Sequence, residues 1–269
     1  MEKYLITLDL DGTLLNSSSK ISQETKTYIQ KLKENGHKIL IATGRPHRGA
    51  KPIYDELQLD TPLIFHNGAG IDKANSKDFN SFEKLIPKAL LDNLFLYFKD
   101  KIVTAFYSIE NELYVYNYLK EVEFFFFLNN ETKVFEGPLN NPTYKQTSNV
   151  IIAVNLEYMQ EFESYIKNSL TELDFRYWYK DELLAIYEVF LKGYNKGTAL
   201  NLIRDFYKIP PNKTISFGDG GNDVELLKVS GHGVKMVNGT DKLNSVKDAI
   251  TSHTNDEDGV IKYLQKFIK

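Results

Sequence analysis

The sequence contains no cysteine. This absence excludes disulfide bonds and thiolate metal sites, and it suits a reducing compartment, so we expect the protein to act in the cytoplasm. No apolar run approaches the roughly 18 residues of a membrane-spanning helix, and the aromatic stretch 124–128 is far too short. Residues 1–3 lead directly into an apolar segment without the basic and apolar regions of a signal peptide. The sequence therefore predicts no membrane partner.

An excess of charge of either sign is also absent. The chain carries 33 Lys and Arg against 36 Asp and Glu, which gives a formal net charge of -3. Because nucleic acids attract strongly basic proteins, we expect no nucleic-acid partner. The remaining composition, with 42% hydrophobic and 26% charged residues, is typical of a soluble globular protein. The 269 residues suggest two domains or one elaborated domain, and they leave the oligomeric state open.

An apolar run ends on two carboxylates near the N-terminus. Residues 4–8 are apolar and are followed by a turn signal at Gly12, which is typical of a buried strand. The two-residue period of a strand would place Asp9 and Asp11 on the same side of the chain. The carboxyl end of a strand is where open α/β sheets bind ligands, although a solvated Asp-Gly turn would have the same residues.

Strand and helix patterns alternate in the first and last thirds of the chain. Apolar strand patterns occur at 4–8, 38–42, 63–65, 214–217 and 233–237, and helix patterns at about 23–35, 46–57, 196–207, 223–229 and from 257. This alternation predicts an α/β fold whose core is a Rossmann-like, doubly wound parallel sheet. We assign residues 1–82 and 189–269 to this core.

The middle of the chain, residues 83–188, has a different pattern. Aromatic residues are frequent, and strands at 102–109, 113–116, 150–156 and 183–189 alternate irregularly with helices at 87–98 and 158–170. We predict an inserted α+β domain. The aromatic stretches are expected to belong to its core, because aromatic rings bury large areas.

Chemically complementary residues follow the predicted strands of the core or begin its helices. They are the Asp9 and Asp11 pair, Thr43, Lys196, and the Asp219 and Asp223 pair in a Gly-rich turn. Each has an ordinary structural explanation, such as a helix cap for Thr43, a solvated lysine for Lys196 or a tight connection for residues 218–221. Their conjunction at one edge of one sheet predicts a site for an anionic ligand and a cation.

At these residues the chain resembles the haloacid dehalogenase superfamily of phosphatases, and within it the Cof-type branch with a large C2-type cap. The resemblance covers the whole chain. The four motifs of that family stand here as Asp9-Leu10-Asp11-Gly12-Thr13, Thr43-Gly44-Arg45, Asn195-Lys196-Gly197 and Gly218 to Asp223. Small departures, such as Leu226 in place of the common Met, concern packing and not chemistry.

The resemblance implies a phosphate-monoester hydrolase with a Mg²⁺ cofactor. Asp9 would be the nucleophile that forms an aspartyl-phosphate, and Asp11 the general acid and base. The cation ligands would be Asp9, the Asp11 carbonyl, Asp219 and Asp223, the last directly or through water. Groups that would bind the phosphate are the amides of Leu10 and Gly44, the Thr43 hydroxyl, Lys196 and Asn222. Arg45 would contact the substrate or pair with the cap, and Asn67 is a second candidate substrate contact.

Small phosphorylated metabolites are the expected substrates, because a cap of about a hundred residues serves to exclude water and bulk from a site. Sugar phosphates come first, followed by phosphorylated cofactors such as flavin mononucleotide or pyridoxal phosphate. A phosphomutase with the same core chemistry is the alternative. A receiver-like phosphorylation switch also groups acidic residues, a Thr and a Lys, but such domains are near half this length and lack the insertion.

Overall fold

The computed structural model describes residues 2–75 and 78–268. It divides into two compact units. The core unit comprises Met1–Arg45, Ala50–Phe82 and Tyr194–Lys269, and the inserted unit comprises Pro46–Gly49 and Glu83–Gly193. The predicted boundary after residue 188 falls inside strand β11 (Leu184–Leu191), so the structural division comes later, after Gly193.

Residues 46–49 belong to the inserted unit although the sequence analysis placed them in the core. Arg48 explains this assignment, since its guanidinium donates to the Ser108 hydroxyl at 2.8 Å and to the Phe127 carbonyl at 3.1 Å. It also donates to the Phe126 carbonyl. Burial lowers the pKa of Arg48 to about 10, yet these oxygen acceptors satisfy the charged group inside the unit.

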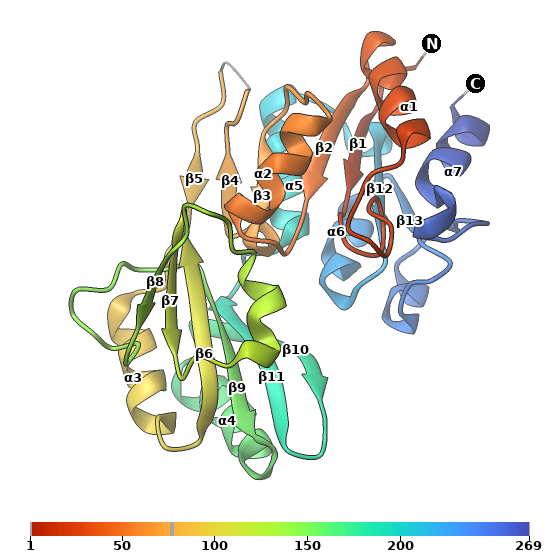
Figure 1. Cartoon of the computed structure of the whole chain (residues 1–269). Helices are drawn as coiled ribbons and strands as arrows, with labels where there is room; N and C mark the ends of the chain where they lie inside the picture. The colour runs from red at the N-terminus through yellow and green to blue at the C-terminus, as the bar shows by residue number, and fades with distance from the viewer. Residues whose placement is uncertain (1, 76–77, 269) are drawn as a thin grey trace. The chain divides into compact units, whose positions relative to one another are not determined.

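The core unit is built on one eight-stranded sheet of order β14-β13-β12-β1-β2-β3-β4-β5 (Figure 1). The pairs β1–β2, β2–β3, β1–β12, β12–β13 and β13–β14 are parallel, whereas β3–β4 is antiparallel. The strands are β1 (Leu5–Leu8), β2 (Lys38–Ala42), β3 (Leu63–Phe65), β4 (Gly70–Asp72), β5 (Phe82–Glu83), β12 (Thr214–Gly218), β13 (His232–Lys235) and β14 (Ala249–Ile250). The predicted doubly wound parallel sheet is confirmed.

Helices cover both faces of this sheet, because the central strands are apolar on both sides. Ile6 and Leu8 of β1 pack with α1 (Gln23–Glu34), α2 (His47–Glu56) and α7 (Gly259–Phe267). Leu5 points to the opposite face, where α5 (Lys196–Tyr207) and α6 (Val224–Val229) lie. Strands buried on both faces are expected in parallel sheets.

The start of α5 is fixed by its own sequence. Asn195 adopts an extended conformation, and its side chain accepts from the Thr198 amide at 2.9 Å, while the Thr198 hydroxyl accepts from the Asn195 amide at 3.0 Å. This reciprocal cap satisfies two N–H groups that the first helical turn leaves unpaired. Lys196 is therefore held at the first helical position.

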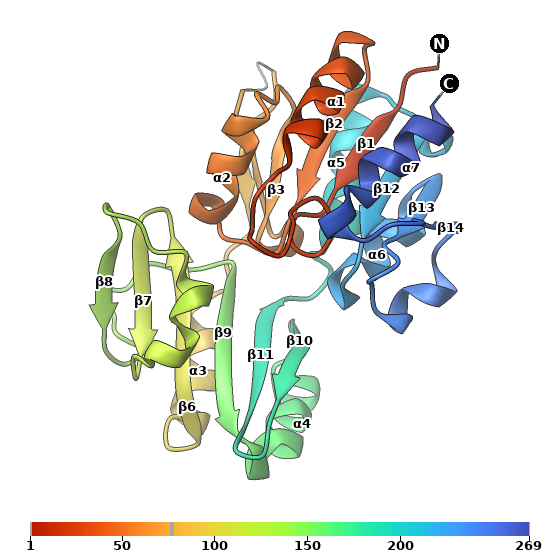
Figure 2. The ribbon, with the colours of Figure 1, turned by 45° about the vertical axis from the view of Figure 1, so that its right-hand side comes forward.

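The inserted unit contains a six-stranded sheet of order β10-β11-β9-β6-β7-β8, antiparallel except for the β7–β8 pair. Its further strands are β6 (Ile102–Ile109), β7 (Glu112–Tyr116), β8 (Lys133–Glu136), β9 (Asn149–Asn155) and β10 (Leu173–Lys180). Helices α3 (Lys88–Phe98) and α4 (Met159–Ser169) lie on one face (Figure 2). Phe98 and Phe162 join them, with ring centroids 5.1 Å apart.

Strands β4, β5, β8, β10 and β14 were not predicted from the sequence. All of these except β10 are short, and tertiary pairing decides such segments more than their own pattern does. The prediction that the aromatic stretches are core holds for Phe126, which is fully buried against Phe106, but not for Phe124, which is 68% exposed. Of the helices in residues 2–75 and 78–268, none has the length and apolar character to cross a membrane.

Candidate active site

The site lies where the chain order of the core sheet reverses. From β1 the sheet continues to β2 on one side and to β12 on the other, so two sequence-distant strand ends become neighbours. Leu8 pairs with Phe217, and the Asp9 amide extends the ladder by donating to the Phe217 carbonyl at 3.2 Å. Such a reversal leaves a crevice at the carboxyl ends of the strands in open α/β sheets.

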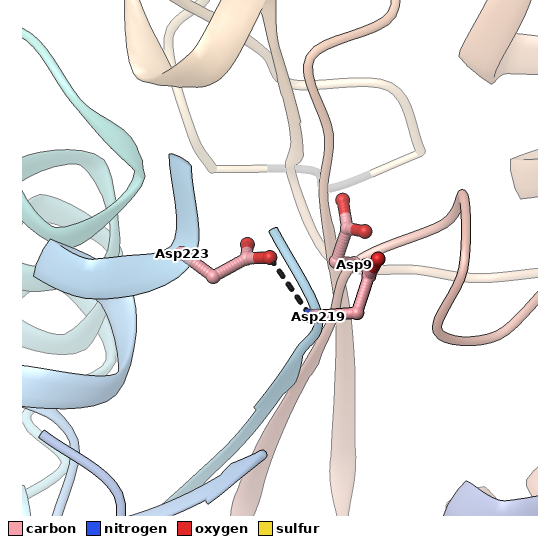
Figure 3. Close-up of side chains that lie close together, drawn as sticks. All are labelled: Asp9, Asp219 and Asp223. Atoms are coloured by element: carbon pink, nitrogen blue, oxygen red, sulfur yellow. Dashed lines mark hydrogen bonds between the residues drawn. The ribbon is translucent and has the colours of Figure 1, made fainter. Parts of the chain in front are cut away.

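Three carboxylates converge there (Figure 3). One side-chain oxygen from each of Asp9, Asp219 and Asp223 lies within 4.8 Å of the others. Within the described part of the chain this acidic group does not include the Asp11 carboxylate. The predicted convergence of these acidic side chains therefore holds for three of the four residues.

Lys196 connects two of these carboxylates. Its ammonium donates to Asp9 Oδ1 at 2.6 Å and to Asp223 Oδ1 at 2.7 Å, and the side chain is fully buried. Burial alone would lower the pKa of this lysine, but the carboxylates of Asp223 and Asp9 outweigh it and hold the pKa above its ordinary value. Lys196 therefore remains a cation in the site and is not one of the solvated lysines of the surface.

Asp223 is held on both of its oxygens. While Oδ1 accepts from Lys196, Oδ2 accepts from the backbone amides of Asp219 at 3.1 Å and Gly220 at 3.0 Å. A Cβ on Gly218 would lie 2.4 Å from the Asp223 Cγ, so a glycine is required at that approach. The Gly-rich turn thus places the fully buried Asp223 carboxylate rather than merely connecting two elements.

The other two carboxylates, Asp9 and Asp219, have pKa values that are raised within this acidic cluster. Burial raises the pKa of Asp9 well above its ordinary value, and the neighbouring Asp223 and Asp219 raise it further against the opposing effect of Lys196. Burial and the Asp223 carboxylate raise the pKa of Asp219 to about 6. Three acids beside a single lysine thus disfavour full ionisation of the site.

Gly12 and Thr13 complete the surroundings of Asp219. The Thr13 hydroxyl donates to Asp219 Oδ1 at 3.0 Å. Gly12 has a φ of +73°, and a Cβ there would lie 2.3 Å from Asp219 Oδ2. From the sequence, Gly12 was predicted to form a turn and Thr13 was identified only as part of a motif. Their contacts with Asp219 explain why a glycine and a small hydroxyl residue follow Asp11.

The structure places the Asp11 side chain apart from Asp9, although the two were predicted to lie on the same side of the chain. Strand β1 ends at Leu8, and the amides of Leu14 and Leu15 turn back onto the Leu10 carbonyl at 3.0 and 2.9 Å. The two-residue period therefore stops before Asp11. Asp9 is buried, whereas the side chain of Asp11 is 56% exposed.

Arg45 binds the Asp11 carboxylate in a bidentate ion pair. Its Nε donates to Oδ2 at 2.7 Å and its Nη2 to Oδ1 at 2.5 Å. The guanidinium is nearly buried while the carboxylate is half exposed, so Asp11 is the more accessible partner. Arg45 was predicted to contact the substrate or to pair with the cap, and its pairing with Asp11 was not predicted because no local spacing indicates it.

The remaining predicted phosphate ligands follow neighbouring strands. Thr43 and Gly44 come directly after β2, and the Thr43 hydroxyl accepts from the Arg45 amide at 3.1 Å. Asn222 lies in the turn after β12, where its side-chain nitrogen donates to Asn67 Oδ1 at 2.8 Å. Leu10 is fully buried in the loop after β1. The three strands β2, β1 and β12 are consecutive in the sheet, so these residues share one edge.

The donor set suits a hard divalent cation. Carboxylate oxygens are the ligands that Mg²⁺ prefers, and two unit charges 4 Å apart repel by about 4 kcal/mol at an effective dielectric near 20. Burial is the main cause of the raised pKa of Asp9 and Asp219, and a divalent cation held by the Asp9, Asp219 and Asp223 group would offset the further contribution from repulsion between the carboxylates.

Fold and site together define a hydrolase of the doubly wound α/β class with an inserted second domain. The family model described as haloacid dehalogenase-like hydrolase matches residues 6–264, and the chain belongs to this family. The chain is 32% identical over 275 residues to the 5-amino-6-(5-phospho-D-ribitylamino)uracil phosphatase of Bacillus subtilis, covering 98% of this chain and 97% of the relative. The protein is a phosphatase of the Cof-type branch, as its motifs predicted.

Solved structures agree with this assignment. A haloacid dehalogenase-like hydrolase from Bacteroides thetaiotaomicron superimposes with a TM-score of 0.83 at 26% identity, covering 99% of this chain and 100% of the other. A phosphatase of the haloalkanoate enzyme superfamily from the same organism gives a TM-score of 0.80 at 28% identity, with 98% and 95% covered. Because the superpositions cover nearly the whole length of both chains, these relatives share the inserted unit.

Proposed function

We propose that the enzyme hydrolyses phosphate monoesters of small metabolites, with sugar phosphates foremost, through an aspartyl-phosphate on Asp9. The observation that carries the proposal is the buried group in which Lys196 bridges Asp9 and Asp223 beside Asp219. A carboxylate at the end of a central strand, held by a cation and next to phosphate-binding amides, is suited to attack phosphorus.

Asp9 is the nucleophile in this proposal. The ammonium of Lys196, at 2.6 Å, favours its ionised form and orients one oxygen. Attack by the carboxylate forms the P–O bond to Asp9 as the bond to the departing alcohol breaks, and water then hydrolyses the acyl phosphate. A covalent route divides one difficult displacement into two easier ones.

Asp11 is the general acid and base. Its half-exposed carboxylate is accessible to a departing alcohol, and Arg45 fixes its orientation through two hydrogen bonds. It would protonate the leaving oxygen in the first step and take a proton from water in the second. Thr43, Asn222 and the amides of Leu10 and Gly44 would hold the phosphoryl oxygens.

Mg²⁺ is the proposed cofactor. Its ligands would be the carboxylates of Asp9 and Asp219 and the Asp11 carbonyl, with Asp223 acting directly or through water. When bound, the cation would offset the repulsion between these carboxylates and the phosphate dianion.

The relatives support the substrate class. The Bacillus subtilis relative is named for a substrate whose phosphate sits on a ribityl chain, which is a sugar alcohol. We extend that class to this enzyme and expect phosphorylated sugars and sugar alcohols to be turned over faster than pyridoxal phosphate, which has no such chain. Flavin mononucleotide also carries its phosphate on a ribityl chain, and we place it behind the sugar phosphates only because of its large ring system. The site would act in the cytoplasm on free metabolites.

A phosphate-release screen tests the proposal. The purified chain is assayed with Mg²⁺ against hexose, pentose and ribitol phosphates, flavin mononucleotide and pyridoxal phosphate, with Asp9→Asn as the matched inactive control. Inorganic phosphate should appear with sugar phosphates, vanish after chelation and return with Mg²⁺. Isomerised sugar phosphate without free phosphate would indicate a phosphomutase, and undiminished turnover in excess chelator would exclude the metal.

A further inference from the structure

The turn His66–Gly68 after β3 has an unusual backbone. Its three residues have φ values of 46°, 53° and 96°, and His66 and Asn67 are both buried. A left-handed conformation is uncommon for residues other than glycine, and two such residues in succession are strained. His, Asn and Gly adopt a positive φ more readily than other residues, but two non-glycine residues in succession still need contacts with the rest of the core unit to hold them.

Those contacts join the turn to segments that carry the phosphate-binding residues. The His66 amide donates to the Arg45 carbonyl at 3.1 Å, and the Asn67 amide donates to the Thr43 carbonyl at 2.9 Å. A Cβ on Gly68 would lie 2.2 Å from the Asn195 carbonyl oxygen, directly before Lys196. The turn is therefore fixed on one side by the segment after β2 and on the other by the start of α5.

The side chain of Asn67 extends this arrangement to the turn after β12. Its Oδ1 accepts from Asn222 Nδ2 at 2.8 Å, and only 2% of Asn67 is exposed. A Cβ on Gly44 would lie 3.1 Å from the Asn67 amide group, so the segment after β2 also packs against this side chain. Asn67 is thus a buried acceptor for a half-buried amide.

We propose that Asn67 is a positioning residue that aims the Asn222 amide at the phosphoryl group. The inference rests on the proposed function. Asn222 Nδ2 carries two N–H groups, and the bond to Asn67 uses one of them and fixes the plane of the amide. The second N–H is then oriented in advance toward a phosphoryl oxygen. The strained turn supplies this orientation, and Asn67 acts through Asn222 and not through contact with the substrate.

A double-mutant cycle with orthovanadate, a mimic of the phosphoryl transition state, tests this inference. Asn67→Gly keeps access to a positive φ but removes the acceptor, and we expect vanadate inhibition in Mg²⁺ to weaken roughly three- to tenfold, the effect of one hydrogen bond. Asn222→Ala should weaken it by roughly ten- to a hundredfold, because that bond is charge-assisted. In the Asn222→Ala background, Asn67→Gly should have no further effect.

Two controls make the cycle specific. Asn117→Gly removes another left-handed asparagine, with a φ of 54°, in the inserted unit, and should leave inhibition unchanged. Asn67→Asp keeps the acceptor and the left-handed preference, so any effect of its charge should be additive with Asn222→Ala. If Asn67→Gly proves too unstable to assay, Asn67→Ala, which likewise lacks the acceptor, takes its place in the cycle.

Additive effects of Asn67→Gly and Asn222→Ala would overturn the inference, because they would show that Asn67 contacts the ligand by itself. An unchanged inhibition constant in Asn67→Gly would overturn it as well. Wild-type turnover in the same assay separates the two proposals. An active enzyme with additive effects loses this inference alone, whereas an enzyme that releases no phosphate loses the proposed function and the inference with it.

Discussion

Replacing Asp219 by Asn should stabilise the metal-free protein while it removes activity. The pKa of Asp219 rises to about 6 from an ordinary value of 3.8, chiefly through burial and the Asp223 carboxylate. At ~1.4 kcal/mol per pKa unit, ionising Asp219 at neutral pH costs the folded protein about 3 kcal/mol of stability. An amide of the same shape avoids this cost and still accepts from the Thr13 hydroxyl.

The sign of the pH dependence follows from proton binding. Because the folded pKa of Asp219 is raised, the folded protein binds a proton that the unfolded chain releases between about pH 4 and pH 6. The stabilising effect of the proton bound to Asp219 is therefore fully present below about pH 4 and is lost as the pH rises through 6. The advantage of Asp219→Asn over wild type should be near zero at pH 4 and reach about 3 kcal/mol at pH 7.5.

Thermal unfolding in chelator at both pH values measures this effect. A gain of about 3 kcal/mol corresponds to a rise in Tm of roughly 6–12 °C for a domain of 150–250 residues. Excess Mg²⁺ should raise the Tm of wild type by a similar amount and leave the variant unchanged, because the cation binds the folded acidic group. If Asp219→Asn were no more stable than wild type in chelator at pH 7.5, or if its advantage did not change with pH, the electrostatic reasoning would be wrong.

Three further substitutions test other parts of the site. Asp9→Asn should keep its fold and lose at least a hundredfold in turnover, ~2.7 kcal/mol in barrier. A variant that kept more activity would show that Asp9 is not the nucleophile. Asp11→Asn should slow both half-reactions by roughly 10²–10⁴-fold. In single turnovers of this variant, the release of p-nitrophenol should be much less impaired than the release of a sugar alcohol. Equal impairment of the two release rates would argue against Asp11 as the general acid. Gly12→Ala should lower the Tm by more than Gly193→Ala. Both glycines have a positive φ, but only a Cβ on Gly12 would lie 2.3 Å from Asp219 Oδ2, whereas Gly193 has open space. Equal losses of Tm would show that the backbone conformation alone, and not the contact with Asp219, causes the destabilisation.

Much of the fold could be predicted because local patterns and tertiary packing agree in the core unit. The apolar residues 38–42 form β2 with the predicted bounds, and the helix 196–207 begins and ends as predicted. Alternation of such elements leaves few topologies other than a doubly wound sheet. The candidate residues Asp9, Lys196, Asp219 and Asp223 also followed from the sequence, since each directly follows a strand or begins a helix at one edge of that sheet.

Tertiary structure alone decided how those side chains meet. The sequence placed Asp9 and Asp11 together, but the chain leaves the strand at Leu8, so one carboxylate is buried with Lys196 and the other pairs with Arg45. It gave no indication that the strained turn at Asn67 binds Asn222, because the two residues are 155 positions apart. A motif identifies chemical groups that can act together. Their orientation, burial and charge state depend on contacts between distant segments, and these exist only after the sheet has brought β2, β1 and β12 side by side.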